Sequence, residues 1–483
     1  MRDRLPDAPP PTADLPAEPL SHSLKQRHLT MLGLGGVIGA GLFVGSGAGI
    51  TLAGPAIVCS YLLAGALAML VMRMLGEMSA AMPASGSFSV HAERALGRWA
   101  GFSVGWLYWF LLVVVLAVEA TGAAKIANGW LPAVDQWLWV LIFMVVFTVA
   151  NLAAVRNFGE FEFWFAALKV GAIVLFLILG TLAVFGLLPD TEPVGLANLT
   201  GQGGFAPHGV AGVVAGLLAV IFAFGGLEVV TIAAAESDDP ARSVARAVRS
   251  AVWRILFFYV GSMLVIVTLL PWQSMLPGVS PYVAVLDSIG IPAAGQIMNI
   301  VVFVALLSAL NANLYGSSRM VFSLAERKEA PTALLKVSRG GVPRRAVFAS
   351  VVFGFASVVL NLLWPDTVFL YLLNAVGAVL LFVWALIAVS QLRLRGRIER
   401  EMPERLTLRM WCFPYLTWAA LVAMAVVLVL MLFDDAARPQ LLWSTGAAGA
   451  VLAVAGLREL RARRAGRKRA GEPDGAGPQG RAG

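Results

Sequence analysis

The sequence predicts an all-α membrane protein of about 12 transmembrane helices, arranged as two inverted five-helix repeats plus two extra helices, with helices 1 and 6 broken. The first observation is composition: 59% of the 483 residues are hydrophobic, 13% are charged, and the mean hydropathy is +0.80. A soluble protein of this length needs far more charge on its surface. The second observation is a series of long apolar stretches, and the third is glycine in the middle of the first and the sixth stretch.

A helix crosses a bilayer with about 20 apolar residues, and twelve stretches meet this requirement. They are roughly 29–50, 55–75, 98–123, 136–154, 161–187, 211–234, 249–271, 294–322, 346–364, 367–391, 411–433 and 440–457. Residues 1–23 are rich in proline and charge, and residues 461–483 are basic and then rich in glycine. We expect both segments to be disordered cytoplasmic tails without a cleavable signal peptide. Residues 24–460 then form the transmembrane domain.

The distribution of positive charge predicts the orientation in the membrane. If the N-terminus is inside, nearly all arginines fall on that same side, and only Lys125 and Arg438 fall on the other. This asymmetry follows the positive-inside rule and predicts a multi-pass protein of the cytoplasmic membrane with both termini in the cytoplasm. The net charge of +8 is therefore no sign of nucleic-acid binding, and the partner that it indicates is the lipid bilayer.

Metal and disulfide chemistry find no support in the sequence. The two cysteines, Cys59 and Cys412, lie within or beside apolar stretches, and the four histidines show no spacing typical of metal ligands. We expect the cysteines to be small apolar side chains, and we expect no metal and no cofactor. The oligomeric state is not predicted.

The first stretch contains Gly39-Ala40-Gly41 within a glycine-rich run, and the sixth contains Gly225-Gly226. Glycine weakens a helix interior, so these glycines indicate that both helices are interrupted. For the first stretch taken alone, close packing between helices explains the glycines nearly as well as an interruption does. A nucleotide-binding loop is excluded because the glycines lack the required spacing and no strand precedes them. Paired interruptions in corresponding spans of two five-span halves indicate a transporter site at the interface of inverted repeats.

Backbone groups freed by such breaks must line a cavity or bind something, because lipid offers no hydrogen bonds. N–H groups at the start of a half-helix suit a carboxylate, and carbonyl groups at the end of one suit an ammonium. Two facing breaks therefore predict a site for a small zwitterion. Bare backbone is needed at Gly41 and Gly225, whereas Gly49 lies outside the break and is expected to tolerate a Cβ atom.

Ionisable residues inside predicted spans are functional candidates because they are costly in lipid. Lys169 lies about eight residues into its span, and it could either reach the headgroups or release and regain a proton during transport. Glu228 follows the second break, and its side chain could be either a structural brace for the broken helix or a proton carrier. Glu119 is expected to be a pocket wall or packing partner. Glu162 and Glu236 lie near cytoplasmic ends and are expected at the interface.

Several motifs resemble a known family. The run Ile38-Gly-Ala-Gly-Leu-Phe-Val-Gly-Ser-Gly47, and Gly76-Glu-Met with Pro83-Ala-Ser-Gly-Ser-Phe88, resemble amino acid permeases of the amino acid–polyamine–organocation superfamily. Similarity to bacterial 4-aminobutyrate permeases rests on further motifs, at 97–101, 105–109, 159–164, 231–238, 390–395, 409–411 and 417–418. The resemblance covers about residues 24 to 460 and implies a LeuT-like fold with proton-driven uptake by alternating access.

The resemblance also assigns roles to particular residues. It implies that backbone groups bind the substrate carboxylate at Ile38, Gly39, Ala40 and Gly41, and that the ammonium and chain lie near Phe222, Phe224 and Gly225. Lys169 matches a lysine that, in proton-coupled relatives, stands where sodium-coupled relatives hold a sodium ion. Relatives often have Ser or Thr at the position of Ala40, so a side-chain contact to the carboxylate there is not expected.

The function expected from these observations is proton-coupled import of a small amino acid, with 4-aminobutyrate as the first candidate. Another neutral amino acid such as alanine, proline or an aromatic one is the alternative, and an exchanger or channel is a further one. An enzyme would need a cluster of catalytic side chains, which the sequence does not contain, and a nucleotide-driven pump would need a phosphate-binding loop. We therefore expect a secondary transporter and not an enzyme.

Overall fold

The computed structural model describes residue 31 and residues 38–84, 87–153, 158–189, 192–228, 231, 239–275, 279–338, 341–374, 376–433 and 438–470. Within these ranges the regular structure is entirely helical, and nine helices are long and apolar enough to cross a membrane. Shorter apolar helices occupy the sixth and seventh predicted spans. The all-α membrane fold is confirmed, whereas the count of twelve spans stays a prediction.

The first half of the chain contains the long helices on which the predicted site depends. Its elements are α2 (Ala40–Phe43), α3 (Gly45–Ala53), η1 (Gly54–Ala56), α4 (Ile57–Ala81), α5 (Ser87–Leu96), α6 (Arg98–Trp130), α7 (Gln136–Ala153) and α8 (Phe158–Val184). The first predicted span is thus split into short helices. Residues 32–37, which precede the predicted break, lie outside the described residues.

The second half is built similarly and adds two helices at its end. Its elements are α9 (Ala197–Thr200), α10 (Gly209–Val220), η2 (Ile221–Phe224), α12 (Pro240–Leu269), η3 (Trp272–Ser274), α13 (Pro281–Ser288), α14 (Ala294–Glu326), η4 (Thr332–Leu335), α15 (Arg344–Leu363), α16 (Val368–Asn374), α17 (Gly377–Glu401), η5 (Pro403–Arg405), α18 (Tyr415–Phe433) and α19 (Arg438–Ala470). The sixth predicted span corresponds to α10 and η2, which end at a pair of glycines.

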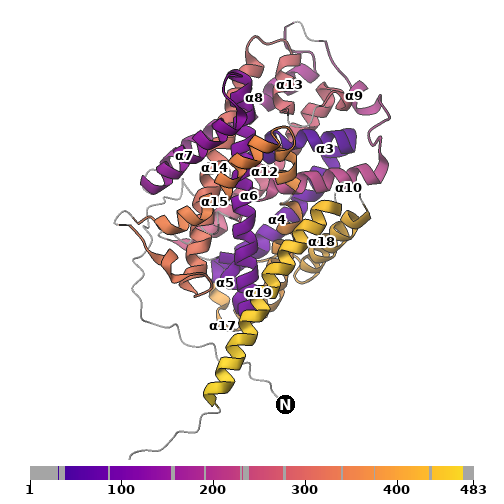
Figure 1. Cartoon of the computed structure of the whole chain (residues 1–483). Coiled ribbons are helices and arrows are strands. Elements are labelled where there is room, and N and C mark those ends of the chain that lie inside the picture. Colours follow the sequence, from indigo (N-terminus) through magenta and orange to yellow (C-terminus); the bar gives the residue numbers. More distant parts are fainter. Residues whose placement is uncertain are drawn as a thin grey trace, which may run out of the picture.

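Helix α6 forms the axis of the bundle. It runs through the middle of the molecule and packs against α14, α5, α7, α15 and α19 (Figure 1). Side chains along most of its length are buried and apolar, so the surrounding helices gain their packing energy against it. Helices α18 and α19 lie together on one flank, and the end of α19 projects past the other helices (Figure 1).

A buried ion pair fastens α4 to α17. The carboxylate of Glu77 pairs with the guanidinium of Arg395 and also accepts a hydrogen bond from the side chain of Gln391 at 2.8 Å. The backbone N–H of Met410 donates to the same carboxylate at 2.5 Å. Thr417 on α18 in turn donates to the amide oxygen of Gln391 at 3.1 Å, so the network joins three helices. Such a network is stabilising only while every member keeps its partner.

We predict that Glu77→Ala destabilises the protein by about 3–5 kcal/mol, because it leaves the buried Arg395 without its main partner. The measurement is thermal unfolding of purified protein in detergent. Glu401→Ala is the matched control. It removes the exposed Arg397–Glu401 ion pair on α17, the helix that also carries Arg395, and such exposed pairs contribute about 0.2–1 kcal/mol. Equal melting temperatures for Glu77→Ala and the control would contradict the role of the network.

Candidate functional site

The first break lies at the predicted position. Helix α2 begins at Ala40, and the backbone bends at Ile38 and Gly39 directly before it. Ile38, Gly39, Ala40 and Gly41 are all buried, so the free N–H groups at this helix start are shielded from water. The start of a helix carries partial positive charge, and this start therefore attracts an anionic group.

That anionic group is a side chain of the protein itself. The N–H of Ala40 donates to both carboxylate oxygens of Glu119, each at 3.1 Å, and Glu119 is only 3% exposed. Glu119 comes from α6, 79 residues further along the chain. Its carboxylate thus occupies the position predicted for a substrate carboxylate. We expected Glu119 to be a pocket wall or packing partner and did not predict this hydrogen bond, because no local sequence pattern links Glu119 to Ala40.

The second break also lies where the glycines predict it. The 3₁₀ helix η2 ends at Phe224, Gly225 is extended, and Gly226 has a φ of 100°. A side chain is strained at such a positive φ, so glycine is required at 226. The carboxylate of Glu228 accepts the N–H of Gly226 at 3.0 Å, the hydroxyl of Tyr108 at 3.1 Å and the indole N–H of Trp384. These three hydrogen bonds tie the Glu228 carboxylate to the backbone of the break and to helices α6 and α17.

The two breaks lie against each other. A Cβ atom at Gly41 would come within 2.6 Å of the Cα of Ala223 in η2, a distance that real side chains avoid. Bare backbone at Gly41 therefore permits the close approach. The expectation that Gly49 tolerates a Cβ is wrong, because that atom would lie 2.7 Å from a methyl group of Val220 on α10. Gly49 thus permits tight packing of α3 on α10.

Aromatic side chains surround the second break. Phe222 and Phe224 are buried, and the ring of Phe224 lies 4.9 Å from that of Tyr259 and 6.1 Å from that of Tyr61. The hydroxyl of Tyr259 donates to the carbonyl oxygen of Ala223 at 2.9 Å. One carbonyl at the end of η2 is thereby bonded, as a buried polar group requires.

Buried charges on α8 lie close to the first break. Lys169 and Glu162 are fully buried, and the ammonium of Lys169 interacts electrostatically with the carboxylates of Glu162 and Glu119. Ser308 on α14 donates to both oxygens of Glu162, at 2.9 and 3.0 Å. The interfacial position expected for Glu162 is wrong. Its seven-residue spacing from Lys169 places both on one helix face, and that spacing was the overlooked signal.

The structure thus assembles the candidate residues around both breaks. Glu119, Lys169 and the unpredicted Glu162 lie at the first break, and Glu228 with Tyr108 and Trp384 lies at the second. The other candidates form the breaks themselves, namely Ile38, Gly39, Ala40 and Gly41 in one and Phe222, Phe224 and Gly225 in the other. Glu236 lies outside the described residues.

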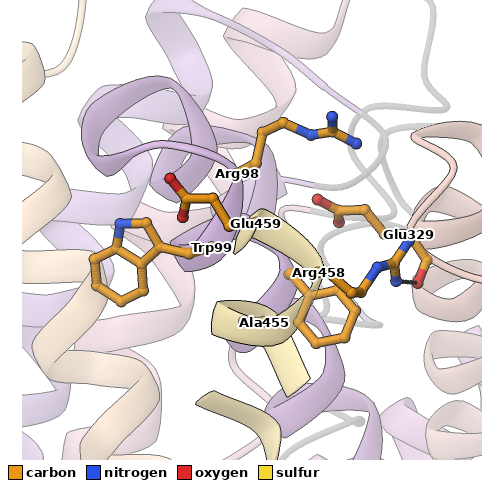
Figure 2. A pocket seen from close by; sticks show the side chains of 7 residues that line it. Arg98, Trp99, Glu329, Ala455, Arg458 and Glu459 are labelled. Carbon is orange, nitrogen blue, oxygen red and sulfur yellow. Dashed lines mark hydrogen bonds between the residues drawn. The ribbon is translucent and has the colours of Figure 1, made fainter. Parts of the chain in front are cut away.

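A separate pocket of about 200 Å³ lies near the N-terminal end of α6 and shares no lining residue with the breaks. Figure 2 shows Arg98, Arg458 and Glu329 around it. Arg458 on α19 donates to the backbone oxygens of Glu329 and Lys328, both at 2.8 Å. Burial raises the pKa of Glu329 to about 7 despite the nearby Arg327. These contacts attach α19 to the end of α14.

Comparison with known proteins identifies the family of this chain. A family model described as amino acid permease matches residues 28–455. The gamma-aminobutyric acid permease of Bacillus subtilis is 52% identical over 90% of this chain and 92% of its own. The aromatic amino acid transport protein AroP of Corynebacterium glutamicum is 51% identical over 88% of this chain and 92% of its own. The gamma-aminobutyric acid permease of Escherichia coli is 45% identical over 88% of this chain and 91% of its own.

A solved structure supports the same fold. The manganese transporter of Eremococcus coleocola aligns with a TM-score of 0.54 over 92% of this chain and 97% of its own, at 13% identity. So low an identity shows a shared fold alone. The extent of the family match and the near-half identity to full-length relatives show that this chain belongs to the amino acid permease family, whose members are transporters and not enzymes.

Proposed function

We propose that this permease imports a small neutral amino acid, with 4-aminobutyrate as the leading candidate, together with a proton across the cytoplasmic membrane. The observation that carries the proposal is the hydrogen bonding of the Ala40 N–H to the carboxylate of Glu119. It supports the first break as a carboxylate-binding position. A substrate carboxylate at this position must displace Glu119, because one N–H group cannot serve both.

Proton coupling follows from the same competition. The buried cluster holds two carboxylates, Glu119 and Glu162, against one ammonium, Lys169. If all three were ionised, one negative charge would lack a partner, and a substrate carboxylate would add a second. Unpaired charge in a low-dielectric interior costs several kcal/mol. A proton taken up with the substrate neutralises one of these two charges and so lowers that cost, and Glu119 is the group best placed to receive it when it leaves Ala40.

The second break would receive the other end of the substrate. The C-terminal end of η2 carries partial negative charge, which suits an ammonium group. The buried ring of Phe224 adds an aromatic face of the kind that attracts cations. In this arrangement Glu228 stays with its three donors as a brace, and a proton need not pass through it.

The size of the site favours a short substrate. At Gly41 the backbone lies so close to Ala223 that not even a methyl group fits at that point, and the ring of Phe224 packs against those of Tyr61 and Tyr259. The relatives named gamma-aminobutyric acid permease agree with this choice. An aromatic amino acid is the second candidate, because the relative named AroP is nearly as similar to the chain.

The orientation is proposed from the distribution of charge. Arginines concentrate at the loops on the side of the N-terminus, while Lys125 lies at the opposite end of α6 from Arg98. By the positive-inside rule the N-terminal end of α6 faces the cytoplasm. Transport by alternating access would then open the two breaks first to the outside and then to the cytoplasm.

The close approach of the breaks predicts a strong effect of Gly41→Ala. A Cβ atom overlapping Ala223 costs about 1–3 kcal/mol. Borne by the substrate-bound state, this cost lowers substrate affinity about fivefold to 150-fold. The measurement is uptake of labelled substrate by proteoliposomes that contain equal amounts of folded protein. Gly446→Ala in α19 is the control, since nothing lies within 4 Å of a Cβ there. Normal uptake by Gly41→Ala would contradict the arrangement.

The competition at Ala40 predicts that Glu119→Gln separates transport from the proton gradient. Glutamine keeps the shape but cannot release a proton, so exchange of labelled substrate should persist while accumulation driven by an imposed pH gradient stops. Lys169→Met should also abolish uphill accumulation. Glu401→Gln, at an exposed position outside the cluster, should transport normally. Gradient-driven accumulation by Glu119→Gln at the normal level would rule out the proposed carrier.

Substrate class is tested by competition with uptake of whichever labelled amino acid from a panel the proteoliposomes accumulate best. We expect unlabelled 4-aminobutyrate and short neutral amino acids to compete, and lysine and glutamate to compete poorly. Among the described residues at the two breaks, Glu119, Glu162 and Lys169 already interact with one another, and Glu228 already has three hydrogen-bond donors. An additional charged side chain would therefore be left unpaired, at a cost of several kcal/mol. Saturable phenylalanine uptake without 4-aminobutyrate uptake would favour the aromatic alternative. Strong competition by lysine or glutamate, with none from 4-aminobutyrate, would contradict both substrate candidates.

A further inference from the structure

Another cavity, with both apolar and polar lining residues, lies at the C-terminal end of α6, which the charge distribution assigns to the outside. Its volume is about 350 Å³, within the range of cavities that hold small ligands. Val44, three residues beyond Gly41, and Phe369 of α16 belong to its lining. The cavity therefore adjoins the first break on the outer side, where an arriving substrate would pass.

Hydrogen-bond donors without partners line this cavity. Ser280 is 6% exposed, and its hydroxyl forms no hydrogen bond. The indole nitrogen of Trp130, at the last residue of α6, is likewise buried without a partner. Buried polar groups are rarely left unbonded, because an unbonded one destabilises the protein. Both lining residues thus have an unused capacity to donate to a ligand.

The charge of the lining selects the kind of ligand. Among the described residues that line the cavity, Lys125 alone is ionisable, and its side chain is exposed. The amide side chains of Gln296 and Asn299 on α14 add further donors. A cluster of donors with one ammonium and no carboxylate is complementary to an anion. It would repel a group that carries only positive charge.

The start of α13 reinforces this preference. Ser280 occupies the N-cap position of this eight-residue helix, yet its hydroxyl does not cap the helix, and Pro281 follows it. Helix starts carry unpaired N–H groups and partial positive charge. A carboxylate in the cavity would meet the positive end of α13 on one side and the ammonium of Lys125 on the other.

We propose that this outer cavity captures the carboxylate of the amino acid substrate before the substrate reaches the breaks, with Lys125 as the cation and Ser280 and Trp130 as hydrogen-bond donors. The inference rests on the proposed function for the identity of the substrate. The carboxylate would then move from Lys125 to the N–H of Ala40 as Glu119 leaves it. Lys125 and Glu119 lie on the same helix, six residues apart, which is about 9 Å along its axis.

The first test is protection of a cysteine at the cavity and needs no transport. Gln296→Cys is introduced after Cys59→Ser and Cys412→Ser, and labelling by an impermeant maleimide is followed in intact cells. Butyrate, which has the carboxylate alone, should slow labelling several-fold, whereas butylamine and chloride at the same concentration should not. Lys125→Met should abolish the protection and Lys125→Arg should retain it.

Absence of protection by butyrate, equal protection in Lys125→Met, or equal protection by butylamine or chloride would overturn the proposal. Labelling only after permeabilisation would overturn the outer location. If the wild-type protein transports no neutral amino acid but butyrate still protects, the proposed function fails and the carboxylate site stands. If uptake is normal without protection, the outer site alone fails.

The second test places the site on the transport path. Lys125→Met and Trp130→Phe should raise the KM for uptake several-fold without lowering the maximal rate, because saturating substrate bypasses a capture step. Lys125→Arg, which keeps the positive charge, should have a KM close to that of the wild-type protein. A fall in the maximal rate at unchanged KM would contradict a capture site, since it would place Lys125 in the transport step itself.

Discussion

Helices that break inside a membrane leave backbone N–H and carbonyl groups that cannot bond to water. In this permease, other parts of the structure supply hydrogen bonds to these groups. At the first break the N–H of Ala40 is bonded by Glu119 from the central helix α6. At the second, Glu228 and Tyr259 bond the backbone of residues 226 and 223. Each partner comes from a packed helix or from the break itself, so the core holds the two breaks in place.

In the proposed mechanism, the hydrogen bond between Ala40 and Glu119 also links substrate binding to the charge of the buried cluster. The carboxylate of Glu119 bonds the Ala40 N–H group in the absence of substrate, and in this mechanism it is released when the substrate carboxylate arrives. The ammonium of Lys169 interacts with the carboxylates of both Glu119 and Glu162. In the proposed mechanism, substrate binding and proton movement share this one set of groups, without a relay between distant sites.

Local features of the sequence predicted most of the fold and both breaks. Glycine pairs at the centres of the first and sixth apolar stretches located the breaks, and the depth of Lys169 in its span marked it as functional. Partners distant in the chain could not be predicted, because residues such as Glu119 and Ala40, or Glu77 and Arg395, share no local pattern. Gly49 was misjudged for the same reason: its neighbour Val220 lies on another helix.

The most direct test of this account is a structure of the permease with its amino acid substrate bound at low pH. The account predicts that the substrate carboxylate accepts the hydrogen bond of the Ala40 N–H and that the side chain of Glu119 has moved away from it. A bound substrate with Glu119 still on the Ala40 N–H, as it is in the present structure, would contradict the competition on which the proposed mechanism depends.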